Sequence, residues 1–320
     1  MLAHWVKEWL LLFYIYCFFG WCFESTYVSL RTGHWVNRGF MKAPFLPLYG
    51  SGAMLLLIVS RSFSENIILT YIAGCIGATI LEFVTGAGME WLFKIKYWDY
   101  SRQRFNLKGH ICLSSTIAWG FLTLFMTRII HEPIEGVVRS LPEAVVTAVV
   151  LVLTIMLAGD FALSFKAAMD LRDVLIKLEE ARADMEELQI RLRSMVEHAG
   201  AQVQRAIEER GAKLDALHHE LTEIRENIQA ELTAGFEVRI SKLHKLAEEN
   251  NLESLEEIKE EYRQWRSRFY ENQHKRLQAL DLSDKFKLHH LKNNPTMNSK
   301  RFKKAMEEMR EQLNKFRDAK

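Results

Sequence analysis

The chain has 320 residues, with 42 Lys and Arg side chains against 40 Asp and Glu. The charges are unevenly divided: residues 1–165 carry 12 basic and 10 acidic side chains, whereas residues 166–320 carry 30 of each. This partition excludes a single uniform soluble domain, and the neutral second half argues against nucleic acid as a partner.

Residues 1–165 contain five apolar stretches that predict membrane-spanning helices. A bilayer core of about 30 Å requires about 20 mostly apolar helical residues. Residues 9–30, 67–93 and 142–165 meet this clearly, and residues 111–130 also meet it. Residues 45–60 are short and contain Pro47, Gly50 and Gly52. The first stretch is too long for a removable signal peptide, and no small-residue cleavage site follows it.

The basic residues of the loops predict an orientation. With five spans, loops 31–44 and 94–110 share a side with the start of the tail, and that side carries 10 Lys and Arg residues against 4 on the other. Cytoplasmic loops are enriched in Lys and Arg. We therefore expect a multi-pass protein of the cell membrane, with lipid as a partner, an outside N-terminus and a cytoplasmic tail. If residues 45–60 do not span, part of this topology inverts.

Two spans carry acidic side chains at membrane depth. Glu24 lies in the first span, and Glu82 and Glu90 lie in the third. Gly74 and Gly86 share the helical face of Glu82, and small residues at this spacing let a neighbouring helix approach closely. A charged group near the bilayer centre costs about 2.5–3.5 kcal/mol, so it has a partner or a function. Glu82 is expected in a helix seam or cavity, either as a protonated hydrogen-bonding group or as a functional carboxylate.

The two basic loops carry the remaining candidate residues. One leads from Asn37 and Arg38 into a segment of prolines and glycines, whose free backbone groups are tolerated at membrane depth only beside protein or water. Two interpretations stay open: a polar network that holds the loops together, or a gate or headgroup-binding cap over a site lined by acidic residues. The candidate binding residues are Glu24, Asn37, Arg38, Tyr49, Glu82, Glu90, Trp98, Asp99, Tyr100 and Asn106.

Several motifs, in order along residues 9–165, resemble one bacterial membrane family. They are Gly20, Trp21 and Glu24; residues 37–40; Pro44, Pro47, Tyr49 and Gly50; Leu81, Glu82, Met89, Glu90 and Phe93; and residues 98–101, Phe105, Asn106, Gly109 and 111–113. The family is the one described as "Putative ABC-transporter type IV", of the CmpB type. Ala43 departs from the pattern, where Gly is expected before the first proline. The resemblance implies a multi-pass membrane protein, labelled a transporter, without an assigned substrate.

The tail begins as a continuation of the last span. From residue 160 to 199 there is no Pro or Gly, and apolar residues then recur at alternating spacings of three and four, with a slip of four at Ala199. This pattern predicts a helical coiled-coil stalk over residues 166–250, and a parallel homo-oligomer through residues 168–232. The alternative is a single amphipathic helix that folds back on later helices.

Residues 251–320 are expected to form charged C-terminal helices. A helix over residues 252–280 and a last helix from near Ser299 flank a linker at residues 293–295. Residues 166–274 have a net charge of −7 and residues 275–320 a net charge of +7. The basic end is expected on anionic lipid, on the acidic stalk, or simply in solvent.

The predicted architecture is therefore all-α: a transmembrane domain over residues 1–165 with a cytoplasmic stalk. No phosphate-binding loop, hydrolase motif or metal-ligand spacing occurs, so we predict no enzyme, cofactor or metal site. The predicted function is a transporter or permease component whose ATPase, if it has one, is a separate subunit. A membrane-anchored scaffold or sensor with a cytoplasmic partner is the main alternative, and a lipid-acting enzyme using Glu82 and Asp99 is another.

Overall fold

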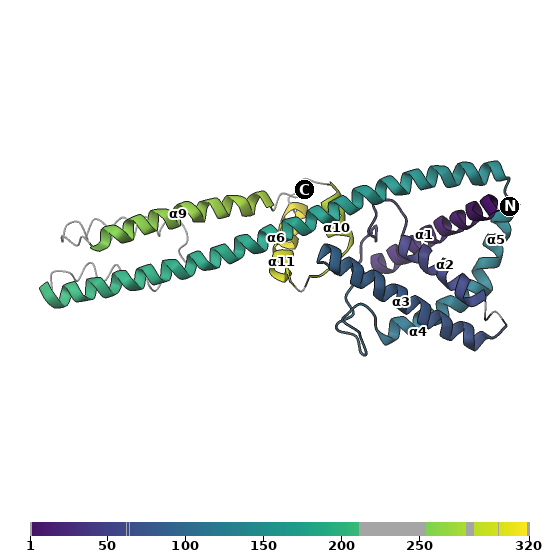
Figure 1. Cartoon of the computed structure of the whole chain (residues 1–320), viewed down its shortest axis with the longest axis horizontal. Helices are drawn as coiled ribbons and strands as arrows, with labels where there is room; N and C mark the ends of the chain where they lie inside the picture. The colour runs from purple at the N-terminus through teal and green to yellow at the C-terminus, as the bar shows by residue number, and fades with distance from the viewer. Residues whose placement is uncertain are drawn as a thin grey trace. The chain divides into compact units, whose positions relative to one another are not determined.

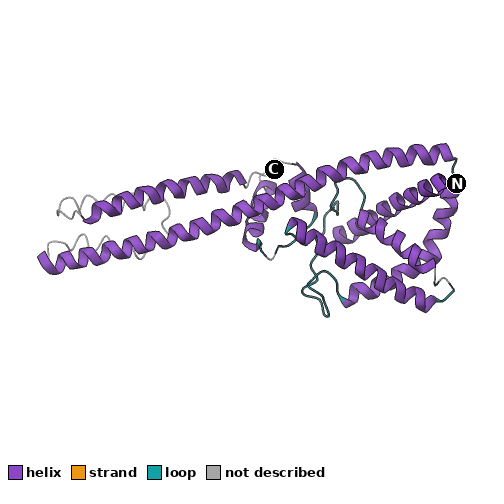
Figure 2. Cartoon of the chain, in the orientation of Figure 1, coloured by secondary structure: helices purple, strands orange, loops and turns teal. Residues whose placement is uncertain are grey.

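The computed structural model describes residues 2–61, 63, 65–210, 254–279, 285–299 and 301–318. These residues form helices, turns and isolated bridges, with no strand among them, which confirms the all-α class for the described part of the chain (Figure 2). The chain divides into two compact units: unit 1 comprises Met1–Leu175 and Asp281–Lys320, and unit 2 comprises Ile176–Leu280.

Unit 1 is a helical bundle to which the C-terminal helices also belong (Figure 1). Its helices are α1 (Leu2–Thr32), α2 (Pro47–Arg61), α3 (Ile67–Phe93), α4 (Leu113–Phe125), η1 (Met126–Ile130), α5 (His131–Ser140), the first part of α6 (Glu143–Arg210), α10 (Lys285–Asn293) and α11 (Lys303–Asp318). The π-helical turn η1 joins α4 and α5 just before Pro133, which has no N–H to donate to a preceding carbonyl.

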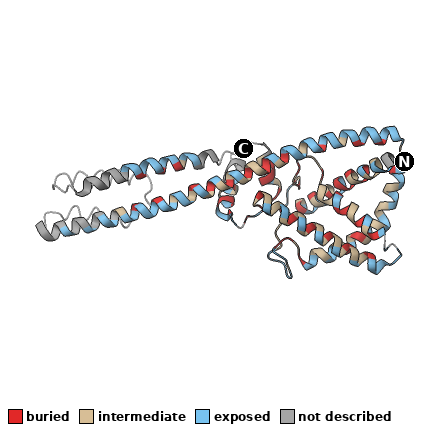
Figure 3. Ribbon diagram, viewed as in Figure 1, coloured by how far each residue is buried: buried red, intermediate tan, exposed pale blue. Residues whose placement is uncertain are grey.

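Within the described ranges, four helices are long and apolar enough to cross a membrane. They are Trp5–Thr32, Ile67–Phe93, Leu113–Ser140 and Glu143–Met195. On α3, the isoleucines at positions 72, 76 and 80, which share one face of the helix, are exposed. Figure 3 shows buried and exposed positions alternating along the helices of unit 1. The fifth expected span, residues 45–60, forms α2, whose 15 residues extend only about 23 Å. It is shorter than a bilayer core, so a fifth span is not confirmed.

Close helix contacts depend on glycine at several positions, of which Gly50 and Gly74 are two. A Cβ atom on Gly50 of α2 would lie 2.3 Å from the Sγ of Cys17 and 2.8 Å from the backbone oxygen of Phe13, both on α1. A Cβ atom on Gly74 of α3 would lie 2.2 Å from the Oγ1 of Thr123 on α4. Small residues therefore let these helix pairs pack closely, as the spacing on α3 predicts.

The loop between α1 and α2 turns back along α1 before α2 begins. The backbone N–H of Leu46 donates to the carbonyl of Cys17, 3.0 Å away, about halfway along α1. At its other end α2 finishes near the start of α1, because Ser60 and Arg61 line a cleft together with Trp5 and Trp9. The loop and α2 together thus extend alongside most of α1.

The two ends of the bundle are distinct. At one end the start of α1 meets the start of α6, where the Nζ of Lys7 lies 3.2 Å from the Oε1 of Glu143. At the other end the loops 33–46 and 94–112 meet α6 and the C-terminal helices. There the backbone N–H of Ala43 donates to the carboxylate of Asp160 at 2.9 Å, and the ring of His290 lies 3.1 Å from the carbonyl oxygen of Ser164.

Residues 293–299, for which the sequence predicts a linker and a helix start, form a partly buried connection between α10 and α11. Asn294, Met297 and Ser299 are each about 1% exposed. Lys96 and Asn298 form an antiparallel bridge with backbone hydrogen bonds of 2.7 and 2.8 Å. The hydroxyl of Ser299 donates to the carbonyl of Lys94 and accepts from the N–H of Phe302, just before α11 begins.

Unit 2 contains the part of α6 that starts at Ile176 and α9 (Ser254–Ala279), in the place of the helix expected over residues 252–280. The indole N–H of Trp265 donates to the carbonyl of Leu188 at 2.7 Å, and both residues are buried. Leu188 is therefore covered by α9 of the same chain, as in the folding-back alternative. The homo-oligomer through residues 168–232 stays a prediction, and the stalk residues beyond Arg210 lie outside the described ranges.

Candidate functional site

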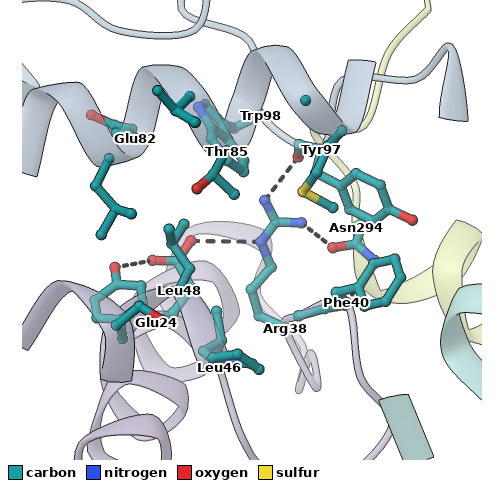
Figure 4. A pocket seen from close by; sticks show the side chains of 18 of the residues that line it. Glu24, Arg38, Phe40, Leu46, Leu48, Glu82, Thr85, Tyr97, Trp98 and Asn294 are labelled. Atoms are coloured by element: carbon teal, nitrogen blue, oxygen red, sulfur yellow. Dashed lines mark hydrogen bonds and ion pairs between the residues drawn. The ribbon is translucent and has the colours of Figure 1, made fainter. Parts of the chain in front are cut away.

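A cavity of about 490 Å³ lies within unit 1, between α1, α2, α3 and the two basic loops (Figure 4). Its polar lining consists of Glu24, Arg38, Tyr49, Ser51, Glu82, Thr85, Tyr97, Trp98, Tyr100, Trp119 and Asn294. Its apolar lining includes Phe40, Leu46, Leu48, Leu81, Val84, Met89, Leu92, Phe93, Phe161 and Phe165. The size is typical of sites for small molecules.

Glu24 of α1 forms an ion pair with Arg38 on one side of the cavity. The Nε of Arg38 lies 3.5 Å from the Oε1 of Glu24, and the hydroxyl of Tyr49 donates to the Oε2 at 2.8 Å. The backbone N–H of Arg38 also donates to the hydroxyl of Ser25, which fixes the loop against α1. The charges of Glu24 and Arg38 therefore balance each other inside the bundle.

The guanidinium of Arg38, only 6% exposed, is held by acceptors from distant parts of the chain. It donates to the carbonyl of Tyr97 at 2.9 Å, to the hydroxyl of Thr296 at 3.2 Å, and to the side-chain oxygen of Asn294 (Figure 4). The amide nitrogen of Asn294 donates to the carbonyls of Gly39 and His290, so its oxygen is left as the acceptor for Arg38. One C-terminal residue thus completes the polar lining.

Glu82 of α3 has a different environment, because its hydrogen-bond donors are neutral. Its side chain is 6% exposed, and it accepts from the hydroxyl of Tyr100 at 3.1 Å and from the indole N–H of Trp119 at 3.0 Å. Within the described part of the chain, no Lys, Arg or His nitrogen lies within 4.0 Å of its carboxylate. Burial and the nearby Glu82 raise the pKa of the Tyr100 hydroxyl, which keeps it a proton donor.

Six of the ten predicted site residues line this cavity. Trp98 does so while its indole N–H donates to the carbonyl of His110 at 2.9 Å. The cavity thus brings together Glu24, Arg38, Tyr49, Glu82, Trp98 and Tyr100.

The other four predicted residues do not line the cavity. The amide oxygen of Asn37 accepts from the indole of Trp21 at 2.6 Å, and Asn106 donates to carbonyls within its own loop. Glu90 pairs with the ring of His110 at 3.0 Å. Asp99 accepts from Ser101; burial raises its pKa, but the hydrogen bonds from Ser101 and Asn298 and the nearby charge of Lys96 together lower it. These contacts correspond to the interpretation of the loops as a polar network.

Among the residues that sequence reasoning missed are Asn294 and Trp119, two lining residues whose side chains form hydrogen bonds with the central polar groups. Asn294 belongs to an Asn-Asn-Pro segment that is typical of a linker, and nothing local points to Arg38, which lies 256 positions earlier. Trp119 lies in an apolar span, where a tryptophan resembles any packing residue. A signal for Trp119 does exist in hindsight: a buried carboxylate on a neighbouring helix needs a donor.

All lining residues except Asn294 lie between positions 24 and 165. This is the part of the chain that matches a known family. Residues 11–165 match the family model "Putative ABC-transporter type IV". This match confirms the resemblance drawn from the sequence motifs. No curated protein and no solved structure matches the chain. The match to this family model and the four apolar helices support a membrane protein related to transporters, without naming a substrate.

Proposed function

We propose that the chain is the membrane-embedded component of a transporter of the permease type, and that the cavity is its substrate site. The observation that carries this proposal is a buried carboxylate, Glu82, facing a cavity of about 490 Å³ among helices of membrane-spanning length. Ionisable residues at such depth mark substrate or ion pathways by default. The irregular backbone before Pro47 also borders the cavity, as broken helices do in transporters.

The proposal includes five membrane crossings. The loop 33–46 returns to the level of Cys17, and α2 continues to the end of the bundle where α1 starts. The loop and the short helix together make one crossing, with the loop backbone buried in protein. The N-terminus and the tail then lie on opposite sides, and the basic loops assign the tail to the cytoplasm. If the transporter uses ATP, the ATPase is a separate subunit, since the sequence has no phosphate-binding loop.

The transport proposal is tested by Glu82→Gln, with Glu90→Gln as the matched control on the same helix. Glu90 pairs with His110 and Lys96, and neither of these nor Glu90 lines the cavity, so its replacement leaves the lining side chains unchanged. Cells that express wild type or Glu90→Gln are expected to share a redistribution of solutes between cytoplasm and medium, which Glu82→Gln abolishes. Untargeted mass spectrometry of both compartments measures it. Equal profiles for all three chains, at equal amounts in the membrane, would remove the role of Glu82.

A second candidate function is a membrane-anchored scaffold or sensor. The observation that favours it is the contact of residues 294–299 with both cavity loops, which links the tail to the cavity. A double variant, Leu188→Glu with Trp265→Ala, breaks the contact of α6 with α9 in unit 2 and leaves the cavity lining unchanged. Retained solute redistribution supports the transporter. Its loss, with the cavity intact, supports signalling through unit 2.

A further inference from the structure

The charges around the cavity do not balance within the described residues. The lining contains two carboxylates, Glu24 and Glu82, and one cationic side chain, Arg38. Arg38 pairs with Glu24, whereas Glu82 receives hydrogen bonds from neutral donors alone. A buried carboxylate without a cationic partner is costly unless a cation or a proton joins it. The unbalanced group faces the cavity, so the missing positive charge has room to bind there.

Aromatic rings surround this carboxylate. Trp119 donates to Glu82 and its ring centroid lies 5.9 Å from that of Tyr49, while Tyr100 donates to the other carboxylate oxygen. Trp98 lines the same cavity. Ammonium groups are attracted to the faces of such rings as well as to a carboxylate. An anion finds no comparable site, because the guanidinium of Arg38 already donates to three oxygen acceptors.

The remainder of the lining is apolar. Phe40, Phe93, Phe161 and Phe165 form a connected aromatic cluster with ring-centroid distances of 5.4 to 6.2 Å. With Leu92 and Val84, these side chains offer a hydrocarbon surface continuous with the polar part of the cavity. A ligand that fits both parts has a charged head and an apolar body.

We propose that the cavity binds an amphipathic ammonium compound. Its cationic head lies against Glu82 between the tryptophan and tyrosine rings, and its apolar body lies along the phenylalanine cluster. This inference rests on the proposed function of the cavity and names its substrate class.

The test uses three probes with the same short chain and different heads: hexyltrimethylammonium, hexyl sulfate and hexanol. Their binding to the purified full-length protein in a nonionic detergent is measured by calorimetry. Wild type and Glu90→Gln are expected to bind the ammonium probe most tightly, and Glu82→Gln to bind it at least roughly tenfold more weakly. Equal affinity in Glu82→Gln, or hexanol bound as tightly as the ammonium, would overturn the inference.

A second measurement avoids any substitution that impairs folding. In the wild-type protein an apolar carbodiimide is expected to modify Glu82, and hexyltrimethylammonium should slow that modification while hexyl sulfate does not. Peptide mass spectrometry locates the product, and unchanged modification with the ammonium present would contradict the proposal. Ammonium binding at Glu82 without solute redistribution would contradict the transport function but not the ligand class. Solute redistribution without ammonium binding would contradict the proposed ammonium ligand but not the transport function.

Discussion

Arg38 owes its position to acceptors from three separate segments of the chain. One of these acceptors is the side chain of Asn294. Its amide nitrogen also donates to the carbonyl of Gly39 in the loop 33–46 and to the carbonyl of His290 in α10. A residue that satisfies a buried guanidinium and a buried loop carbonyl at once stabilises both. Residue 294 therefore links the loop 33–46 to the C-terminal helices.

Asn294→Ala is expected to destabilise this region by about 1–3 kcal/mol, because it leaves an Arg38 N–H and the Gly39 carbonyl buried without partners. Hydrogen–deuterium exchange of the peptides that cover α10 and α11 should accelerate. The matched control is Asn298→Ala, whose exposed side chain makes one long contact of 3.4 Å with Asp99 while its backbone bridge remains. The control should change stability by less than about 0.5 kcal/mol. Similar exchange rates in both variants would show that the side chain of Asn294 does not link the loop 33–46 to the C-terminal helices.

The residues of the site were predictable to different degrees. The placement of Glu82 followed from its spacing of eight residues from Gly74 and four from Gly86, since residues four apart share a face of a helix. Arg38 followed from the density of polar residues beside the broken segment. Asn294 had no local signal, because its role depends on a contact across 256 positions and not on a repeat.

At the scale of elements, α1 and α2 approach so closely that side-chain volume at their contact is limited. The Cβ position of Gly50 is occupied by a sulfur atom and a backbone oxygen of α1, and the backbone oxygen cannot move without bending that helix. Gly159 of α6 offers the opposite case, because nothing lies within 4 Å of its Cβ position. Comparing substitutions at Gly50 and Gly159 therefore distinguishes the effect of side-chain packing from the effect of helix propensity.

Gly50→Ala is expected to destabilise the protein by about 1–3 kcal/mol through overpacking. Gly159→Ala is expected to be neutral or to stabilise by up to about 1 kcal/mol, since alanine favours the helix and meets no neighbour. Thermal unfolding of the purified proteins in detergent measures both. A Gly50→Ala protein as stable as Gly159→Ala would mean that the two helices separate more easily than their contacts indicate.

The long apolar helices were the easiest elements to predict, because hydropathy over about 20 residues is a strong signal. Pro47 and the glycines indicated that α2 would be short. They did not indicate that α2 lies along half of α1. The π-helical turn at Met126–Ile130 gave no signal beyond Pro133. In unit 2, the apolar stripe around Leu188 predicted that another helix packs against it. The stripe alone does not show whether that helix belongs to a second copy of the chain or is α9, since both would bury the same face.

On the scale of the whole molecule, the five-crossing proposal is tested by two exposed positions at opposite ends of the bundle. Ser140 ends α5 near the start of α6, and Gln103 lies in the loop 94–112. In intact cells a membrane-impermeant maleimide is expected to label Ser140→Cys, and to label Gln103→Cys only after permeabilisation. The unsubstituted chain, with its four native cysteines, gives the background. Labelling of both positions under the same condition would rule out this topology.

The contact between Arg38 and Asn294 has a consequence for biosynthesis. A ribosome adds about 5–20 residues per second, so Asn294 is made roughly 13–51 s after Arg38, which precedes it by 256 positions. During that interval the spanning helices are already available for insertion, while the guanidinium lacks its amide partner. A nascent chain halted before residue 294 therefore carries a cavity in which Arg38 is paired with Glu24 but lacks its acceptors from residues 294 and 296.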